Sequence, residues 1–150
     1  MSGQRQPAGF LMFGSWAPDA VLSHKLELSG GWHAAREARR RLNALLAGRV
    51  SPDDLSDVVV LASELVTNAV RHGGAGPGDE IVVHLAIAAN VLRVEVCDFG
   101  PGFVPPAVLR PRAQGGGNGL VLVERLSSCW GVSGDDGTCV WFERLLEATA

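Results

Sequence analysis

The fold of this chain is decided by the stretch Glu64-Leu65-Val66-Thr67-Asn68-Ala69-Val70-Arg71-His72. It lies late in an apolar segment whose hydrophobic residues recur at the helical spacing of about 3.6 residues per turn. The apolar arc of this predicted helix comprises Leu55, Val58, Val59, Ala62, Leu65, Val66, Ala69 and Val70. Glu64 and Asn68 lie one turn apart on the side of the helix opposite this arc, together with Arg71. His72 lies at the edge of the arc. Because Val60 and Leu61 fall beside this polar pair, we expect the pair to face a partly dry cleft rather than open water.

A second informative element ends in Asp98. Residues 91–97 alternate as a strand does, with Leu92, Val94 and Val96 on one face and Arg93 and Glu95 on the other. The same period places Asp98 on the apolar face, directly before a Gly-Pro-Gly turn. A carboxylate is costly to bury there unless hydrogen-bond donors meet it. The residues alone leave open whether Asp98 binds a ligand or only caps the turn.

The third element is glycine-rich and reads Gln114-Gly115-Gly116-Gly117-Asn118-Gly119-Leu120. It leads into an apolar run that predicts a helix over residues 118–128. Glycines that open a helix favour anion binding, because the backbone N–H groups can approach the anion and the helix dipole attracts it. Taken alone, the same sequence also fits a flexible loop.

In this order and spacing, the three elements resemble the ATP-binding domain of the GHKL superfamily, which includes histidine-kinase catalytic domains, gyrase-type ATPases and Hsp90. The nearest likeness is its single-domain branch, the bacterial anti-sigma regulatory factors with serine-protein-kinase activity that abound in actinobacteria. The motifs that carry it are Glu-Leu-Val-Thr-Asn-Ala-Val-Arg-His-Gly from Glu64, Asp-Phe-Gly-Pro-Gly-Phe from Asp98, Gly-Asn-Gly-Leu from Gly117 and Gly-Thr-Cys-Val-Trp-Phe from Gly137. The resemblance covers roughly residues 20–145.

The pattern of elements predicts an α+β fold, and the resemblance specifies a two-layer α/β sandwich of the GHKL type, with a mostly antiparallel sheet and helices on one face. We expect helices over residues 32–47, from 51 to about 73 and over 118–128, with Trp32 facing inward. Strands are expected over residues 20–28, 81–87, 91–97, 130–133 and 138–144. Residues 1–18 are expected to be a flexible tail, residues 19–147 one domain, and the irregular segment 101–117 a lid.

The resemblance also implies a role for each matching residue. Glu64 corresponds to the general base, and Asn68 to the ligand of Mg²⁺. Asp98 corresponds to the acceptor of the adenine amino group, and Thr138 to a hydroxyl that closes on adenine. The residues implied to bind ATP are Asn68, Asp98, Gly100, Gly102, Gly115, Gly117, Asn118, Gly119, Leu120 and Thr138.

Several of these residues also have plainer interpretations. Glu64 fits a structural carboxylate that bridges a metal-bound water, Asn68 a helix-surface residue, and Thr138 a strand residue without a role. Arg71 and His72 could flank the phosphates or simply complement the helix dipole. Two groups of arginines have two open interpretations each. Arg110 and Arg112 in the lid either touch the γ-phosphate or are only solvated. The arginines on the outer side of the first helix either contact a partner protein or are only solvated; they are Arg36, Arg39, Arg40 and Arg41.

Composition limits the function. The 47% hydrophobic and 19% charged residues are typical of a globular protein, and the net charge of −3 gives no electrostatic reason to expect nucleic-acid binding. The apolar runs are far shorter than the ~20 residues of a membrane-spanning helix. Cys97, Cys129 and Cys139 are odd in number and lack metal-ligand spacing, which predicts reduced thiols in a cytoplasmic protein.

The resemblance therefore predicts an ATP- and Mg²⁺-dependent serine/threonine kinase that sequesters a sigma factor. It would phosphorylate and inactivate a STAS-type antagonist of that anti-sigma activity. The resemblance leaves open whether it forms a homodimer, as relatives commonly do. Two alternatives stay open. One is a catalytically weak ATP-binding module that regulates a partner through nucleotide-dependent binding; the other is a kinase that phosphorylates a histidine on a separate protein.

Overall fold

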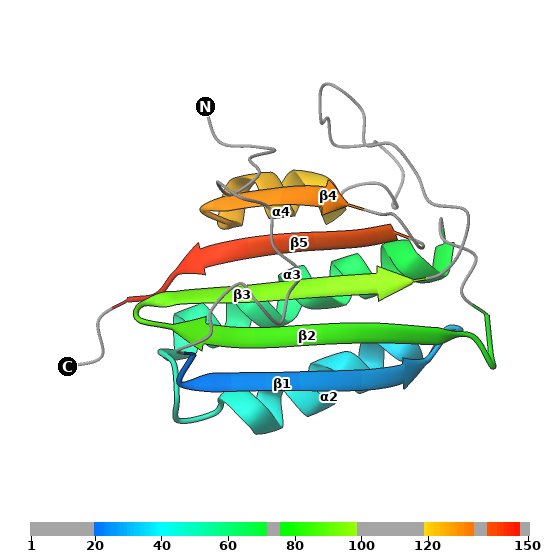
Figure 1. Cartoon of the computed structure of the whole chain (residues 1–150), viewed down its shortest axis with the longest axis horizontal. Helices are drawn as coiled ribbons and strands as arrows, with labels where there is room; N and C mark the ends of the chain where they lie inside the picture. The colour runs from blue at the N-terminus through cyan, green and yellow to red at the C-terminus, as the bar shows by residue number, and fades with distance from the viewer. Residues whose placement is uncertain (1–19, 72–75, 99–118, 134–137, 148–150) are drawn as a thin grey trace.

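The structure, a computed structural model, describes residues 20–71, 76–98, 119–133 and 138–147. Within these residues, a first strand is followed by two helices, two strands, a further helix and two final strands (Figure 1). The strands are β1 (Leu22–Ser29), β2 (Glu80–Ala88), β3 (Val91–Asp98), β4 (Cys129–Ser133) and β5 (Thr138–Leu145). The helices are α2 (Ala34–Leu46), α3 (Pro52–Arg71) and α4 (Gly119–Leu126). The predicted elements are thus all present, and their ends differ from those expected by at most two residues.

The strands form one sheet in the order β1-β2-β3-β5-β4, and every neighbouring pair is antiparallel. Figure 1 shows all the helices on one face of this sheet. Alternation along the strands directs apolar side chains such as Leu85, Val94 and Phe142 toward the helices, where they are fully buried. This arrangement confirms the predicted α+β sandwich with helices on one face.

Helix α3 is the central helix, because it packs against α2, α4 and β3. Its start follows from the sequence: the Ser51 hydroxyl accepts a hydrogen bond from the Asp54 N–H at 3.1 Å, and Pro52 occupies the first turn. Its buried face is wider than the predicted arc, since Leu61 is fully buried as well. Val60, by contrast, is 39% exposed, so the dry surroundings expected around the polar pair are contributed by Leu61.

The inward orientation expected for Trp32 is wrong. Its side chain is 83% exposed and stacks on the His33 ring, with 3.6 Å between the ring centroids. The helical period does not extend to Trp32, because α2 begins only at Ala34. The turn before it contains Gly31 at φ 97°, a conformation that a side chain disfavours, and this turn directs Trp32 away from the core.

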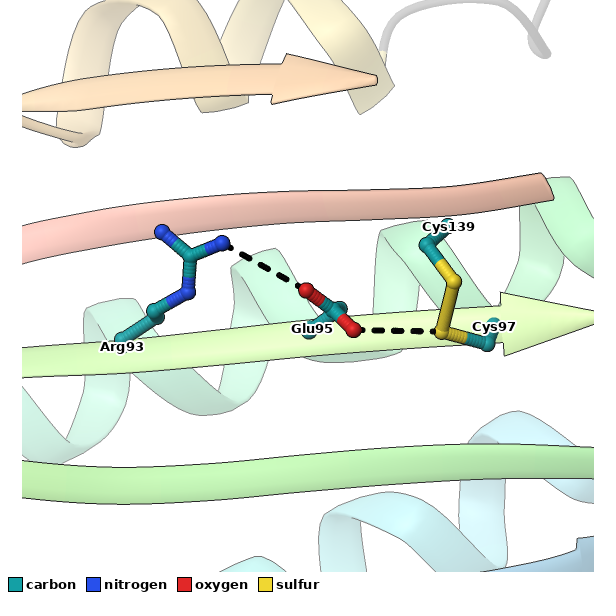
Figure 2. The surroundings of a disulfide bond; sticks show 4 residues. All are labelled: Arg93, Glu95, Cys97 and Cys139. Carbon is teal, nitrogen blue, oxygen red and sulfur yellow. Dashed lines mark hydrogen bonds and ion pairs between the residues drawn. A yellow bond between two sulfur atoms is a disulfide. The ribbon is translucent and has the colours of Figure 1, made fainter. Parts of the chain in front are cut away.

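The prediction of reduced thiols is also wrong for two of the three cysteines. Cys97 on β3 and Cys139 on β5 lie directly opposite each other in the sheet and form a disulfide, with their Cα atoms 4.0 Å apart (Figure 2). Strand pairing brings together residues that are 42 positions apart in the sequence, so their spacing alone did not suggest a bond. Cys129 lies outside this bond, and its thiol contacts Glu143 Oε1 at 3.2 Å.

The sheet face opposite the helices carries a buried polar network. Arg93 is only 1% exposed and lies between Glu95 and Glu143, with N–O distances of 3.4 and 3.3 Å. Its guanidinium carbon lies 4.1 Å from the ring centroid of Trp141, a cation–π contact. Gly131 on β4 makes room for this ring, because a Cβ atom there would lie 2.8 Å from Trp141 Cζ2.

Candidate functional site

The candidate site is centred on the last residue pair of the β3–β5 ladder, Asp98 and Thr138. These residues are direct cross-strand partners, although 40 positions separate them in sequence (138 − 98). Their side chains are 6% and 5% exposed. Asp98 is two positions from Val96 and Thr138 two positions from Val140, so their side chains lie on the same sheet face as these core valines, the face that the helices cover. A buried carboxyl and a buried hydroxyl thus lie side by side at the edge of an apolar layer.

Helix α3 contributes the second part of the site. Asn68 is buried at 8% exposure, and Glu64, one turn earlier, is partly buried. The helix packs on β3, and Figure 1 shows its C-terminal end on the same side of the domain as the end of β3. Two further polar side chains in this segment bond within the helix: Ser63 Oγ donates to the Val60 carbonyl and Thr67 Oγ1 to the Ser63 carbonyl, both at 2.9 Å. The helix backbone therefore already satisfies those hydroxyls, whereas Glu64 and Asn68 carry the carboxylate and carboxamide chemistry.

Helix α4 begins at Gly119, as expected from the glycine-rich segment, and it packs against α3. The backbone of Gly119 and Leu120 therefore forms a helix N-terminus next to the helix that carries Asn68. The other predicted site residues, Gly100, Gly102, Gly115, Gly117 and Asn118, lie outside the described residues, as do His72, Arg110 and Arg112. Arg71 is exposed at the end of α3.

These groups allow a definite chemistry. A buried carboxylate selects a ligand with a hydrogen-bond donor, since an unpaired buried acceptor costs roughly 1–3 kcal/mol. The neighbouring hydroxyl of Thr138 both donates and accepts. The carboxamide oxygen of Asn68 is a hard ligand of the kind that Mg²⁺ takes, and Glu64 adds a carboxylate one turn away. The residue types therefore fit a ligand that carries both hydrogen-bond donors and a metal-bound anionic group.

A different cavity lies at the opposite end of the sheet. It has a volume of about 450 Å³ and is lined by residues such as Leu22, Arg49, Ile87 and Asn90. The described lining contains none of Asp98, Thr138, Asn68 and Glu64. We therefore do not place the ligand site there.

A group with metal-ligand chemistry lies on the face of the sheet away from the helices. The ligand atoms of Glu95, Cys97 and Cys139 all lie within 4.8 Å of one another. However, soft metals bind thiolates, and the two sulfur atoms here are bonded to each other. In this state the group does not have the ligands of a zinc site.

Burial affects the titration of two residues on this face. It raises the pKa of the Glu95 carboxyl, and the attraction of Arg93 offsets only part of that shift. Burial also lowers the pKa of His84, with a smaller contribution from the positive charge of Lys25. His84 is the direct cross-strand partner of Glu95, so the strip beside the disulfide favours neutral side chains.

Sequence reasoning missed this strip. Alternation assigned Arg93 and Glu95 to the polar face but gave no sign that they are buried. A signal was present nonetheless, because Arg93, Glu95 and Cys97 share one face of β3, and Cys139, Trp141 and Glu143 share one face of β5. Two strands that each carry charged and cysteine side chains on one face, with a tryptophan on one of them, indicate a structured surface.

Comparisons with known proteins agree with this geometry. Residues 32–144 match the family described as "Histidine kinase-like ATPase domain". The anti-sigma F factor of Clostridium acetobutylicum is 29% identical over 114 residues, which cover 69% of this chain and 80% of that protein. The C4-dicarboxylate transport sensor protein DctS of Rhodobacter capsulatus is 35% identical over 88 residues; these cover 55% of this chain but only 13% of the sensor.

A solved structure gives the same result. The crystal structure of the RsbU and RsbW domains of a Mycobacterium tuberculosis protein is similar to this chain with a TM-score of 0.62 and 28% sequence identity. The match covers 85% of this chain and 34% of the mycobacterial one. Among the described residues, none of the helices is both long enough and apolar enough to cross a membrane.

Proposed function

We propose that this chain, which belongs to the family of histidine kinase-like ATPase domains, is an ATP-dependent protein-serine/threonine kinase that acts as an anti-sigma regulatory factor. The observation that carries the proposal is the pairing of Asp98 with Thr138 at the end of the β3–β5 ladder, on a strand against which α3, the helix that carries Asn68 and Glu64, packs. The similarity to an anti-sigma F factor supports the regulatory part.

In this proposal Asp98 and Thr138 recognise the base. The Asp98 carboxylate accepts a hydrogen bond from the adenine amino group, and Thr138 Oγ1 bonds the ring beside it. Guanine presents a carbonyl oxygen where adenine has its amino group, so the hydrogen bond from that amino group to Asp98 would not form. Loss of such a bond in a buried site costs roughly 1–3 kcal/mol, which corresponds to about a five- to 150-fold preference for adenine.

Asn68 and Glu64 act at the phosphates. The carboxamide oxygen of Asn68 would hold Mg²⁺, which neutralises charge on the phosphate oxygens when bound. Glu64 accepts the proton of the attacking serine hydroxyl while the serine oxygen bonds to the γ-phosphorus and the bond to the ADP oxygen breaks. The N-terminus of α4 at Gly119 adds backbone N–H groups where the phosphates carry charge.

The proposed substrate is a serine of a STAS-type anti-sigma antagonist, and the proposed second partner is a sigma factor, both in the cytoplasm. The second candidate function is an ATP-binding module that regulates its partner without efficient phosphate transfer. This candidate is favoured because the residues proposed to bind the base, Asp98 and Thr138, lie on the sheet, whereas the proposed catalytic residue, Glu64, lies on a helix. The base can therefore be bound without the help of Glu64.

Incubation with a cognate STAS-type protein, labelled ATP and Mg²⁺ tests the two candidates together. A kinase gives acid-stable phosphoserine on the partner with wild type and none with Glu64→Gln, although the variant still binds ATP. Asp53→Asn, a change of an exposed carboxylate three turns earlier on the same helix, is the matched control and keeps the activity. If Glu64→Gln regulates the partner as well as wild type does, the binding-module function is correct. Acid-labile phosphate would contradict serine transfer.

A further inference from the structure

The disulfide lies one residue from the candidate site. Cys97 and Cys139 pair directly opposite each other, and the next pair in the ladder is Asp98 with Thr138. Figure 2 shows the bond joining the two strands close to the end of β3. Because successive side chains of a strand point to opposite faces, the sulfur atoms lie on one face of the sheet and the Asp98 and Thr138 side chains on the other. The bond therefore fixes the backbone of the site without occupying the ligand side.

The position at the end of the ladder gives the bond its effect. Asp98 is the last residue of β3 and Thr138 the first of β5. The ends of secondary structure open most easily, because fewer neighbouring contacts hold them. A covalent link at the penultimate pair keeps the last pair in register. Without the link, the carboxyl and the hydroxyl keep their geometry only for the fraction of time in which the ladder end is closed.

We propose that the Cys97–Cys139 disulfide is a redox-sensitive latch on the nucleotide site: the oxidised form holds Asp98 and Thr138 in binding register, and reduction by a dithiol of the thioredoxin class lowers nucleotide affinity. This inference rests on the proposed function, because it concerns the same site. In a cytoplasmic protein, disulfides are usually transient and redox-sensing rather than permanent, which agrees with a regulatory role.

The reduction follows from the surroundings of the two sulfur atoms. Cys139 is the more exposed, being partly buried, whereas Cys97 is 8% exposed, so the reductant thiolate attacks Cys139 Sγ and Cys97 Sγ leaves. The second thiol of the reductant then displaces Cys139. The protein gains two electrons and two protons, and the reductant becomes a disulfide.

Glu95 lies where the leaving sulfur needs a proton. Its Oε1 atom is 3.4 Å from Cys97 Sγ, close enough for the protonated carboxyl to supply a proton to the thiolate that forms there (Figure 2). Burial raises the pKa of that carboxyl, which favours the protonated form. Glu95 thus transfers its proton to the Cys97 thiolate and is reprotonated from solvent.

The test compares oxidised and reduced full-length protein. Alkylation and mass measurement define the two states, because one of the three cysteines is modified when the bond is closed and all three when it is open. Calorimetric titration with a non-hydrolysable ATP analogue and Mg²⁺ is then run on each state, with EDTA-treated protein to exclude bound metal. If the reduced ladder end is closed about a tenth of the time, the dissociation constant rises about tenfold on reduction. Equal affinity in the two states overturns the latch.

Variants and a second readout complete the test. Cys97→Ser/Cys139→Ser should bind with the reduced affinity whatever the redox condition, whereas the control Cys129→Ser should keep the full redox response. Hydrogen exchange at the Asp98 and Thr138 amides should speed up on reduction of wild type and of Cys129→Ser even without nucleotide, and unchanged exchange in these two proteins overturns the latch. Redox-dependent exchange in a folded protein that binds no nucleotide in either state would overturn the proposed function instead.

Discussion

Replacement of Asp54 by alanine should strongly destabilise the fold, because this carboxylate joins the start of α3 to the C-terminal end of the described chain. Its side chain is fully buried. Oδ1 accepts a hydrogen bond from Arg144 Nε at 2.8 Å, and Oδ2 accepts one from the Glu147 N–H, also at 2.8 Å. Arg144 has two further partners, Asp57 Oδ2 at 2.8 Å and the Leu126 carbonyl at 2.9 Å. One cluster thus holds α3, α4 and β5 together.

The magnitude follows from what remains after the change. Removing one partner of a buried ion pair costs roughly 3–5 kcal/mol, because the other charge stays buried. Arg144 keeps Asp57 and a carbonyl, so we expect the lower end, about 3 kcal/mol, for Asp54→Ala. A domain has only about 5–15 kcal/mol of stability in total, so the effect is large.

Urea unfolding at pH 7 measures the effect. With a slope of about 1–3 kcal/mol per molar urea, the midpoint should fall by about 1–3 M. Glu37→Ala is the control, since it removes a carboxylate from an exposed ion pair with Arg40 and should leave the midpoint unchanged. If the two variants unfold at the same midpoint, the reasoning about the buried cluster is refuted.

The pH dependence of the same site is an additional check. Burial raises the pKa of Asp54, but hydrogen bonds from the Glu147 backbone and from Arg144 outweigh it, so the pKa is lower in the folded protein. The carboxylate therefore contributes stability above the unfolded pKa of about 3.9, and this contribution is lost as the pH falls through the folded value. The stability gap between wild type and Asp54→Asn should shrink below about pH 4.

Three further predictions concern the sheet. Burial lowers the pKa of His84, so the unfolded chain binds more protons below pH about 6.5 and wild type should lose stability there; thermal unfolding of His84→Gln should lack this loss. Gly131→Ala would place a Cβ atom 2.8 Å from the Trp141 ring, and urea unfolding should show a loss of about 1–3 kcal/mol. Thr138→Val should preserve the midpoint of unfolding but weaken binding of an ATP analogue by about 1 kcal/mol, or fivefold, in calorimetry; unchanged affinity would remove Thr138 from the site.

Local patterns predicted the elements well because their periods are strong. The apolar spacing in α3, its start at Ser51 and Pro52, and the alternation in β3 each depend on neighbours in sequence. The errors arose where distant residues decide the outcome. Neither the disulfide between Cys97 and Cys139 nor the burial of Arg93 follows from local sequence, since both require the pairing of β3 with β5.

The candidate site also combines features that local sequence predicts with features that depend on distant residues. Placing Asp98 on the helix-facing side was a local inference from alternation, and the structure confirms it. Its pairing with Thr138 depends on a register between distant strands, which was not predicted; the family resemblance implied only that both residues contact adenine. The roles of Glu64, Asn68 and the glycines stay predictions. Gly100, Gly102, Gly115 and Gly117 lie outside the described residues.

The central claim, that Asp98 and its neighbours bind ATP, is tested most directly by calorimetric titration with a non-hydrolysable ATP analogue. Wild type and Asp98→Asn are compared with and without Mg²⁺, and Asp53→Asn, an exposed change at the far end of α3, serves as the control. We expect Mg²⁺-dependent binding by wild type and Asp53→Asn and its loss in Asp98→Asn, in proteins with equal unfolding midpoints. Undiminished binding by Asp98→Asn, or no binding by folded wild type, would contradict the account.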